Sequence, residues 1–253
     1  MEGEVSLRIS VLTLLILFLF FPYVSALTIH GVQVSDVYPG DNGVILVITN
    51  EILSPGMCLG DTFNCTLVPD MVSTDIFYVS KDGYYFLGEY PEDPNITFEG
   101  GLWKLFLHTW NGSVENVTFD PACLKPSSRA PLNLSDISVH WKKIVLGSLI
   151  IEYPQDFLGF YHNSSGDYTV VIENMKVKKI LSYFPFLISV NGKLYPLYTF
   201  TEEGLIQVPP KVSPNLTCTS SMSTTRKNTT TRSICGPGLI GLLALVPLAF
   251  RKR

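Results

Sequence analysis

The chain has 253 residues, of which 46% are hydrophobic and 16% are charged, and its formal net charge is −4. This apolar fraction is enough to bury the core of one large domain or of two small ones. The acidic balance excludes nucleic acid as a partner, because phosphate binding requires a broad basic surface. The densest basic spot holds only Lys176, Lys178 and Lys179.

The N-terminus has the features of an export signal. An apolar run over residues 9–21 is followed by Val24-Ser25-Ala26, small residues that predict cleavage after this triplet. We therefore expect residues 1–26 to be a signal peptide. Glu2 and Glu4 depart from the usual basic start, so an uncleaved N-terminal anchor is the alternative. Both interpretations place the rest of the chain outside the cell.

The body of the chain after the signal peptide is expected to be all-β. A β-branched run, Val44-Ile45-Leu46-Val47-Ile48, follows a turn rich in proline, glycine and asparagine. Hairpins are predicted at Asn111-Gly112 and Asn191-Gly192, because Asn-Gly readily adopts the positive φ angles of tight turns, and a third at Lys81-Asp82-Gly83. Only residues 155–161 have helical character, as one or two turns. Short strands separated by such turns predict an antiparallel β-sandwich.

One short stretch resembles a known class of module. Val37-Tyr38-Pro39-Gly40-Asp41, followed by a strand that ends at Ile48-Thr49-Asn50, is similar to the opening of immunoglobulin-like modules in archaeal surface proteins. The resemblance implies an all-β fold and carries no activity. We therefore expect one or two immunoglobulin-like sandwiches.

A proline-rich polar stretch at residues 120–135 divides the body. Thirteen acidic and four basic side chains lie between residues 27 and 134, whereas seven of each lie between residues 135 and 212. A change of charge beside such a stretch indicates a domain boundary. We expect an acidic β-sandwich domain at 27–124 and a second β domain at 134–212. A single sandwich with a long crossover loop is the alternative.

Glycosylation signals are frequent. Eight of the twelve asparagines stand in Asn-X-Ser/Thr sequons, the acceptor pattern for N-glycosylation of exported chains. A glycan needs an accessible acceptor, so the same positions predict exposed loops or strand edges. The sequon residues are Asn64, Asn95, Asn111, Asn116, Asn133, Asn163, Asn215 and Asn228.

Four of the five cysteines predict two disulfides, since thiols oxidise on an exported chain. Cys58 and Cys65 enclose a short loop that a bridge between them would close. Cys123 and Cys218 then pair with each other. Zinc binding is the alternative, although these cysteines have no C-x-x-C spacing and no neighbouring histidine.

Motifs for catalysis are absent from the sequence. It lacks G-x-S-x-G, H-E-x-x-H, a Walker loop and the dinucleotide glycine fingerprint, and its histidines, His30, His108, His140 and His162, are scattered singly. We therefore assign no catalytic, cofactor-binding or metal-binding residue. Aspartates such as Asp75 are expected to be solvated loop acids rather than calcium ligands.

Aromatic residues exceed what one strand face requires, as the pair Tyr84-Tyr85 and the cluster Tyr183-Phe184-Pro185-Phe186 illustrate. Neighbouring residues on a strand point to opposite faces. The favoured interpretation is burial on both faces, in two layers. The other is a surface of exposed rings that stack on sugars or cover a partner.

The C-terminal part changes in character twice. Residues 213–234 contain twelve serines and threonines among twenty-two residues, which predicts a disordered, solvated stalk. Residues 235–253 then begin with Cys235-Gly236-Pro237-Gly238, continue as an apolar run and end in Arg251-Lys252-Arg253. Because lysine and arginine stay on the cytoplasmic side, this order indicates a membrane-directed segment.

That segment resembles the CGP-CTERM sorting signal of surface proteins from Thermococcus-group archaea. The resemblance covers residues 235–253 only. It implies recognition by a membrane sorting and processing enzyme at Cys235, Gly236 and Pro237, with Cys235 as the point of lipid attachment. A short transmembrane anchor is the alternative for the same residues.

These features predict a secreted protein anchored at the extracellular face of the cell membrane, with a structural or binding role. Its expected partners are the membrane, the sorting enzyme, and a glycan or protein ligand; no cofactor is implied. The alternative is an extracellular hydrolase, such as a glycosidase, which would need two carboxylates about 5–9 Å apart in a cleft.

Overall fold

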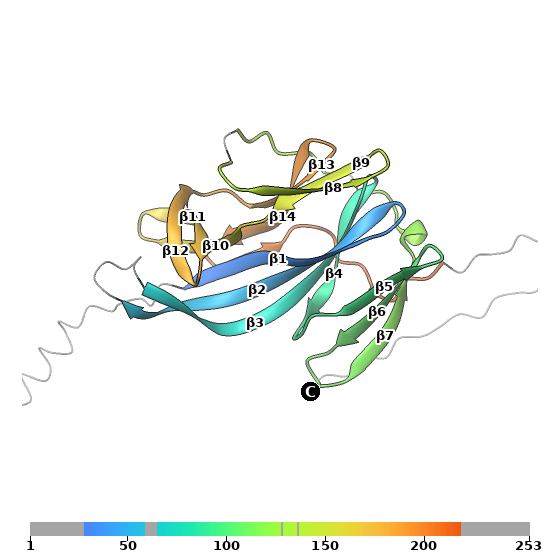
Figure 1. The fold of residues 1–253 in the computed structure, drawn as a ribbon, viewed down its shortest axis with the longest axis horizontal. Coiled ribbons are helices and arrows are strands. Elements are labelled where there is room, and N and C mark those ends of the chain that lie inside the picture. Colours follow the sequence, from blue (N-terminus) through green and yellow to red (C-terminus); the bar gives the residue numbers. More distant parts are fainter. Residues whose placement is uncertain (1–27, 59–64, 128, 136, 219–253) are drawn as a thin grey trace, which may run out of the picture. The chain divides into compact units, whose positions relative to one another are not determined.

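Apolar runs and tight turns fold the described part of this chain into fifteen β-strands, joined into three antiparallel sheets (Figure 1). The structure, a computed structural model, describes residues 28–58, 65–127, 129–135 and 137–218. These residues include one 3₁₀ turn, η1 (Pro121–Cys123), and no α-helix. The predicted all-β class is confirmed.

Sheet A has seven strands and combines the first and the later parts of the chain. In spatial order its strands are β12 (Lys176–Ser182), β11 (Gly166–Glu173), β10 (Phe157–Asn163), β1 (Ile29–Pro39), β2 (Gly43–Cys58), β3 (Cys65–Ser80) and β4 (Gly83–Tyr90).

Two smaller sheets complete the fold. Sheet C has five strands, in the order β15 (Gly204–Gln207), β14 (Lys193–Thr201), β13 (Phe186–Val190), β9 (Leu149–Pro154) and β8 (Trp141–Leu146). Sheet B has three strands, in the order β5 (Asn95–Glu99), β6 (Leu102–His108) and β7 (Val114–Phe119).

Sheet A is covered on both faces along residues 43–48 of β2, residues 73–80 of β3 and most of β4. Val44, Leu46 and Ile48 of β2 pack into a core shared with sheet C, whereas Ile45 and Val47 pack into a second core shared with sheet B. Successive side chains of a strand point to opposite faces, so a strand between two layers must be apolar at every position. This arrangement explains the uninterrupted run that begins β2.

The same rule places the aromatic residues. Tyr84 lies in the core beneath sheet C, and its neighbour Tyr85 lies in the core beneath sheet B. Trp103 and Phe186 are also fully buried. Burial in two layers, the favoured interpretation of the aromatic excess, is confirmed for these residues.

Strands β1 and β10 join the two parts of the chain. Their register places Gly31 directly opposite Gly159. A Cβ at Gly159 would lie 2.6 Å from Ile29 Cγ2, and one at Gly31 would lie 2.6 Å from the Phe157 ring. Neighbouring side chains therefore already fill the space that a Cβ of either glycine would need.

This pairing shows that the predicted division into domains at 27–124 and 134–212 is wrong. Strands from both ranges are joined in sheet A, and the described residues belong to one compact unit that ends at Cys218. The proline-rich stretch packs down: Ser127 N–H donates to Asp82 O, and Leu132 N–H donates to Leu194 O. The stretch is therefore a crossover loop within one unit, which was the alternative prediction.

The predicted hairpins and the predicted helical turns had different outcomes. All three hairpins are confirmed, and at the β13–β14 turn Asn191 and Gly192 have φ angles of 50° and 78°. The helical turns expected at 155–161 are wrong, because residues 157–163 form β10. That strand bonds to β1 on one side and β11 on the other.

The end of the folded part returns to sheets A and B. Phe86 N–H donates to Pro210 O, and Val212 N–H donates to Phe86 O, so this segment covers the open edge of β4. Asp120 N–H then donates to Leu216 O. The stalk expected from residue 213 therefore begins no earlier than residue 219, and the remaining stalk residues lie outside the described part.

Among the residues that the structure describes, no helix has the length and hydropathy needed to cross a membrane.

A substitution at Gly159 tests whether the unit unfolds as a whole. In Gly159→Ala the new methyl group overpacks Ile29 and Val170, so we expect the free energy of unfolding to fall by about 1–3 kcal/mol. The measurement is urea unfolding followed by tryptophan fluorescence and by far-ultraviolet circular dichroism.

Both probes should report one shared transition that shifts together, because the strands of sheet A come from both parts of the chain. Gln33→Ala, at an exposed position of β1, is the control and should leave the midpoint unchanged. Two separate transitions, only one of which moves, would contradict a single unit.

Candidate functional site

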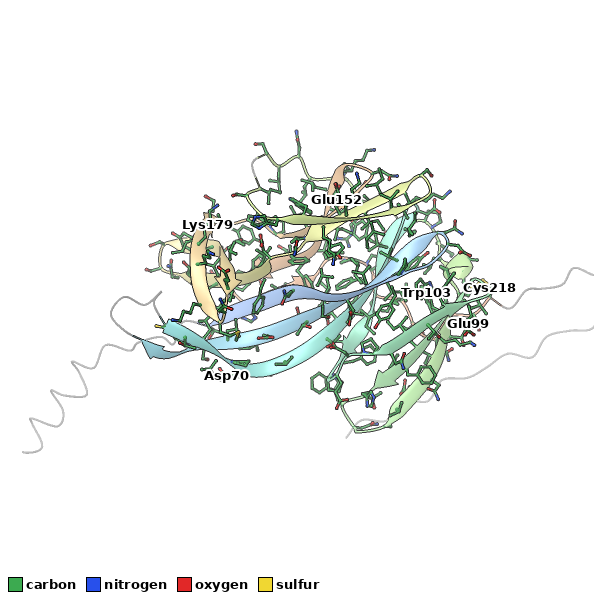
Figure 2. All side chains as sticks on the ribbon, in the orientation of Figure 1. Asp70, Glu99, Trp103, Glu152, Lys179 and Cys218 are labelled. Atoms are coloured by element: carbon green, nitrogen blue, oxygen red, sulfur yellow. A yellow bond between two sulfur atoms is a disulfide. The ribbon has the colours of Figure 1, made fainter. Side chains whose placement is uncertain are left out.

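A groove with a volume of about 980 Å³ lies along one end of sheet A. Its walls come from Gln33 of β1, from β11 and β12, and from two connecting segments, 138–140 and 155–157. Figure 2 shows Lys179, one of its lining residues, on β12.

Hydrogen bonds hold segment 138–140 over the sheet. His140 N–H donates to Asp156 Oδ2 at 2.8 Å, and Gln155 N–H donates to His140 O at 2.8 Å. On the other side Lys179 Nζ donates to Ser138 Oγ at 2.7 Å. The segment is thus bonded both to the start of β10 and to β12, which makes the groove wall well defined.

Within the groove, His140 and Asp156 form a histidine–carboxylate pair. His140 Nδ1 lies 2.9 Å from Asp156 Oδ1, and a carboxylate can only accept there, so Nδ1 carries the hydrogen. The His140 side chain is 86% exposed, whereas that of Asp156 is 16% exposed. The carboxylate therefore orients an imidazole whose Nε2 can contact a molecule in the groove.

The rim of the groove has an unusual backbone conformation. The β11–β12 turn consists of Asn174 and Met175, with φ angles of 52° and 56°. Asparagine tolerates this region, but for methionine it costs about 1–2 kcal/mol. Met175 O accepts a hydrogen bond from Leu67 N–H at 2.7 Å, which helps to hold the turn in place. Strain of this kind concentrates at functional sites.

Opposite charges balance within the groove. Lys178 pairs with Glu173, Asp156 contacts His140, and Lys179 contacts the Ser138 hydroxyl, so the groove contains two ammonium groups and two carboxylates. Each carboxylate already has a basic partner. The groove therefore presents mixed hydrogen-bond donors and acceptors rather than a field of one sign.

A second polar cluster is buried between sheets A and C. Asp75 of β3 is fully buried, and its Oδ2 accepts from Tyr198 O–H at 2.6 Å, Asn50 Nδ2 at 2.8 Å and Gln207 Nε2 at 3.1 Å. Its Oδ1 has no partner among the described residues. The expectation that Asp75 is a solvated loop acid is wrong, because β3 carries it into the interior.

Burial controls the protonation of Asp75. Desolvation raises the pKa of this carboxyl to about 6, although hydrogen bonds from Tyr198, Gln207 and Asn50 act in the opposite direction. The charge of Glu89 raises it further. Neutral Asp75 would carry its proton on Oδ1, the oxygen that accepts no hydrogen bond. This cluster links sheet C to sheet A and does not line the groove described above.

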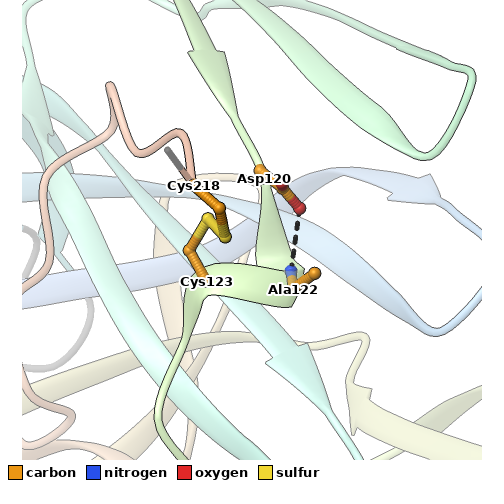
Figure 3. The surroundings of a disulfide bond; sticks show 4 residues. All are labelled: Asp120, Ala122, Cys123 and Cys218. Carbon is orange, nitrogen blue, oxygen red and sulfur yellow. Dashed lines mark hydrogen bonds between the residues drawn. A yellow bond between two sulfur atoms is a disulfide. The ribbon is translucent and has the colours of Figure 1, made fainter. Parts of the chain in front are cut away.

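The predicted bridge between Cys123 and Cys218 is present (Figure 3). Cys65 is also disulfide-bonded, and its predicted partner, Cys58, stands directly opposite it in the register of β2 and β3. Asp120 lies close to Cys123 and Cys218, but the two sulfurs are bonded to each other and cannot ligate a metal ion. Asp120 instead caps η1 through Ala122 N–H.

The sequon asparagines lie mainly on the surface. Five of the six within the described residues are exposed, and Asn163 is half-buried; the exposed ones are Asn95, Asn111, Asn116, Asn133 and Asn215. The other two, Asn64 and Asn228, lie outside the described residues. So do the predicted signal peptide and the predicted processing residues Cys235, Gly236 and Pro237.

Sequence reasoning missed the pair of His140 and Asp156 as well as the partners of Asp75. The first pair is separated by sixteen positions and comes together only because 138–140 crosses above the start of β10. Tyr198 stands 123 positions from Asp75. No local motif marks either cluster, since each depends on strands that are distant in the chain.

The chain was compared with known protein families, with curated protein sequences and with solved structures, and none of them matches it.

The state of Asp75 predicts a pH dependence of stability. The folded chain keeps the Asp75 proton up to about pH 6, whereas the unfolded chain releases it near the ordinary value of 3.8. The contribution of this group is therefore complete below pH 4 and is lost as the pH rises through 6. A shift of this size corresponds to about 3 kcal/mol.

Asp75→Asn mimics the neutral acid, so urea unfolding between pH 4 and 7.5 should show a flatter stability profile than the wild type. Asp70→Asn, which removes an exposed carboxyl from the same strand, is the control. An unchanged slope in Asp75→Asn would show that Asp75 does not control the profile.

Proposed function

We propose that this chain is an exported protein anchored at the cell surface, where its all-β unit binds a glycan or protein ligand. Residues 1–26 direct export, residues 219–234 form the spacer, and Cys235 and the residues after it supply the anchor. The ligand site of this proposal is the groove along β11, β12 and segment 138–140.

The bridge between Cys123 and Cys218 carries the proposal. Disulfides persist in oxidising compartments, and this one closes a loop with a sequence separation of 95 between its cysteines. Constraining so long a loop stabilises a chain by about 4–5 kcal/mol in the loop-entropy account. Cys218 is the residue directly before the proposed spacer. A force transmitted through the spacer would therefore act on a residue that is covalently bonded to Cys123.

The groove supports binding of a polar ligand. It offers amide groups from Gln33, Gln155 and Asn174 and an oriented imidazole at His140, with apolar surface from Val139 between them. Few polar groups on a partly apolar concave wall are the usual composition of ligand sites. Paired charges favour a neutral or zwitterionic ligand, such as a saccharide or a peptide, over a highly charged one.

The alternative, a glycosidase-like hydrolase, would use Asp156 and Glu173, the two carboxylates of the groove. Such enzymes keep one carboxyl protonated as the acid and the other ionised. Here each carboxylate is already engaged by a side chain, His140 or Lys178, and neither is left free in the groove to act on a substrate. We therefore favour binding over hydrolysis.

The anchor is tested by Cys235→Ala in the full-length chain. We expect the variant to appear in the medium instead of the membrane fraction, or to remain as a larger, unprocessed form, because the point of lipid attachment is gone. Immunoblots of the fractions give the measurement, and Ser233→Ala is the matched control. Unchanged size and membrane retention in Cys235→Ala would contradict this anchor.

The groove is tested by probing glycan and peptide arrays with residues 27–218. For any ligand found, Lys179→Ala and His140→Ala should each weaken binding about tenfold or more, since each removes a hydrogen-bonding group of the wall. Lys193→Ala, in the exposed β13–β14 turn, should not. Equal affinity in all variants would place the ligand elsewhere, and cleavage of an arrayed glycan would favour the hydrolase.

A further inference from the structure

The outer face of sheet B is mostly polar, but its central strand β6 presents two apolar side chains there. Trp103, Leu105 and Leu107 of β6 point inward and are buried, whereas Leu102 and Phe106 alternate with them and point outward. Phe106 is 41% exposed. The ring lies on the middle strand, between the two edge strands β5 and β7.

The register of sheet B places an acceptor asparagine on each side of this ring. Phe106 stands directly opposite Asn95 of β5 and directly opposite Asn116 of β7. Directly opposed residues have Cβ atoms about 4.5–5.5 Å apart. The two sequon threonines, Thr97 and Thr118, likewise flank Lys104, so both sequons point their asparagine and threonine outward from the same face.

These two asparagines differ from the acceptors in turns. Asn111 Oδ1 accepts from Ser113 N–H, and Asn163 Oδ1 accepts from Ser165 N–H, so both amides help to form their turns. Within the described residues, the side-chain amides of Asn95 and Asn116 make no hydrogen bond and are exposed. Their strands, β5 and β7, are the two edges of sheet B, where a modifying enzyme has access.

We propose that Asn95 and Asn116 carry N-linked glycans whose first sugar rings pack on Phe106 from both sides. The apolar C–H face of a pyranose fits the face of a phenyl ring, and the strand register supplies the short distance. The outer face of sheet B is then a glycan-covered surface rather than a docking surface for another protein.

The modification is a group transfer from an oligosaccharide carried on a polyprenyl phosphate or diphosphate. Asn Nδ2 forms a bond to the anomeric carbon while the bond from that carbon to the phosphate oxygen breaks. The lipid phosphate leaves with the electron pair, and the amide nitrogen loses one proton. No oxidant or reductant takes part. The proposal rests on the export component of the proposed function, because the transfer occurs outside the cytoplasm.

The first test reads occupancy in the full chain, produced in a host that N-glycosylates exported proteins. Glycopeptide mass spectrometry of the exported protein should find sugar on both Asn95 and Asn116. A bare amide at either position on exported protein overturns the glycan proposal and leaves the proposed function standing. Retention of the chain inside the cell overturns the proposed function and the glycan proposal with it.

The second test separates contact from occupancy. Removing both acceptors in Asn95→Gln/Asn116→Gln should lower the melting temperature by about 2–4 °C. Phe106→Ala should produce the same loss in the glycosylated chain and no further loss in the chain without acceptors. In proton NMR spectra, ring-current shifts of the first sugar should disappear in Phe106→Ala.

Leu102→Ala is the matched control for the second test. Leu102 is an exposed apolar residue of the same strand and face, but its opposite neighbour is Glu99 rather than a sequon asparagine. Its effect on the melting temperature should be equal with and without glycans. If Phe106→Ala also has equal effects in the two backgrounds, or if the sugar signals do not change, the contact is absent and the proposal is overturned.

Discussion

The fold depends on keeping both faces of residues 43–48 of β2, residues 73–80 of β3 and most of β4 out of water. A strand that is apolar at every position cannot lie at a surface, because one half of its side chains would remain exposed. Sheet C covers one face of these strands and sheet B covers the other, with separate cores on the two sides. Neither smaller sheet is an independent module, since each owes its buried face to sheet A.

This constraint is met by joining strands from distant parts of the sequence in one sheet. The strands that extend sheet A beyond β1 come from residues 157–182, and within the sheet they pair with the first four strands where β10 meets β1, around the two opposed glycines. The buried carboxyl of Asp75 adds a second link, because its partners Tyr198 and Gln207 belong to sheet C. The chain then returns along β4, and the bridge between Cys123 and Cys218 closes the unit.

Two surfaces of the described residues are proposed to act outside the cores. The groove beside β12 has a wall held by hydrogen bonds, an oriented histidine and a turn with positive φ angles, which support the proposed ligand site. The outer face of sheet B has its ring between two acceptor asparagines and is suited to sugars attached to the chain itself. One surface would therefore bind, while the other would be shielded.

Local chemistry made part of this structure predictable. The Asn-Gly turns are readable because positive φ angles are a property of one or two residues, and the pairing of Cys123 with Cys218 followed from the short loop between Cys58 and Cys65. The export and anchor interpretation likewise rests on terminal segments whose patterns are contiguous. Only the tertiary structure decided the antiparallel union of β1 and β10, the burial of Asp75, the contact of His140 with Asp156 and the position of Phe106 between two sequons. Each of these depends on strand order and register, which are determined by how all the apolar faces can be buried together and not by any one stretch of residues.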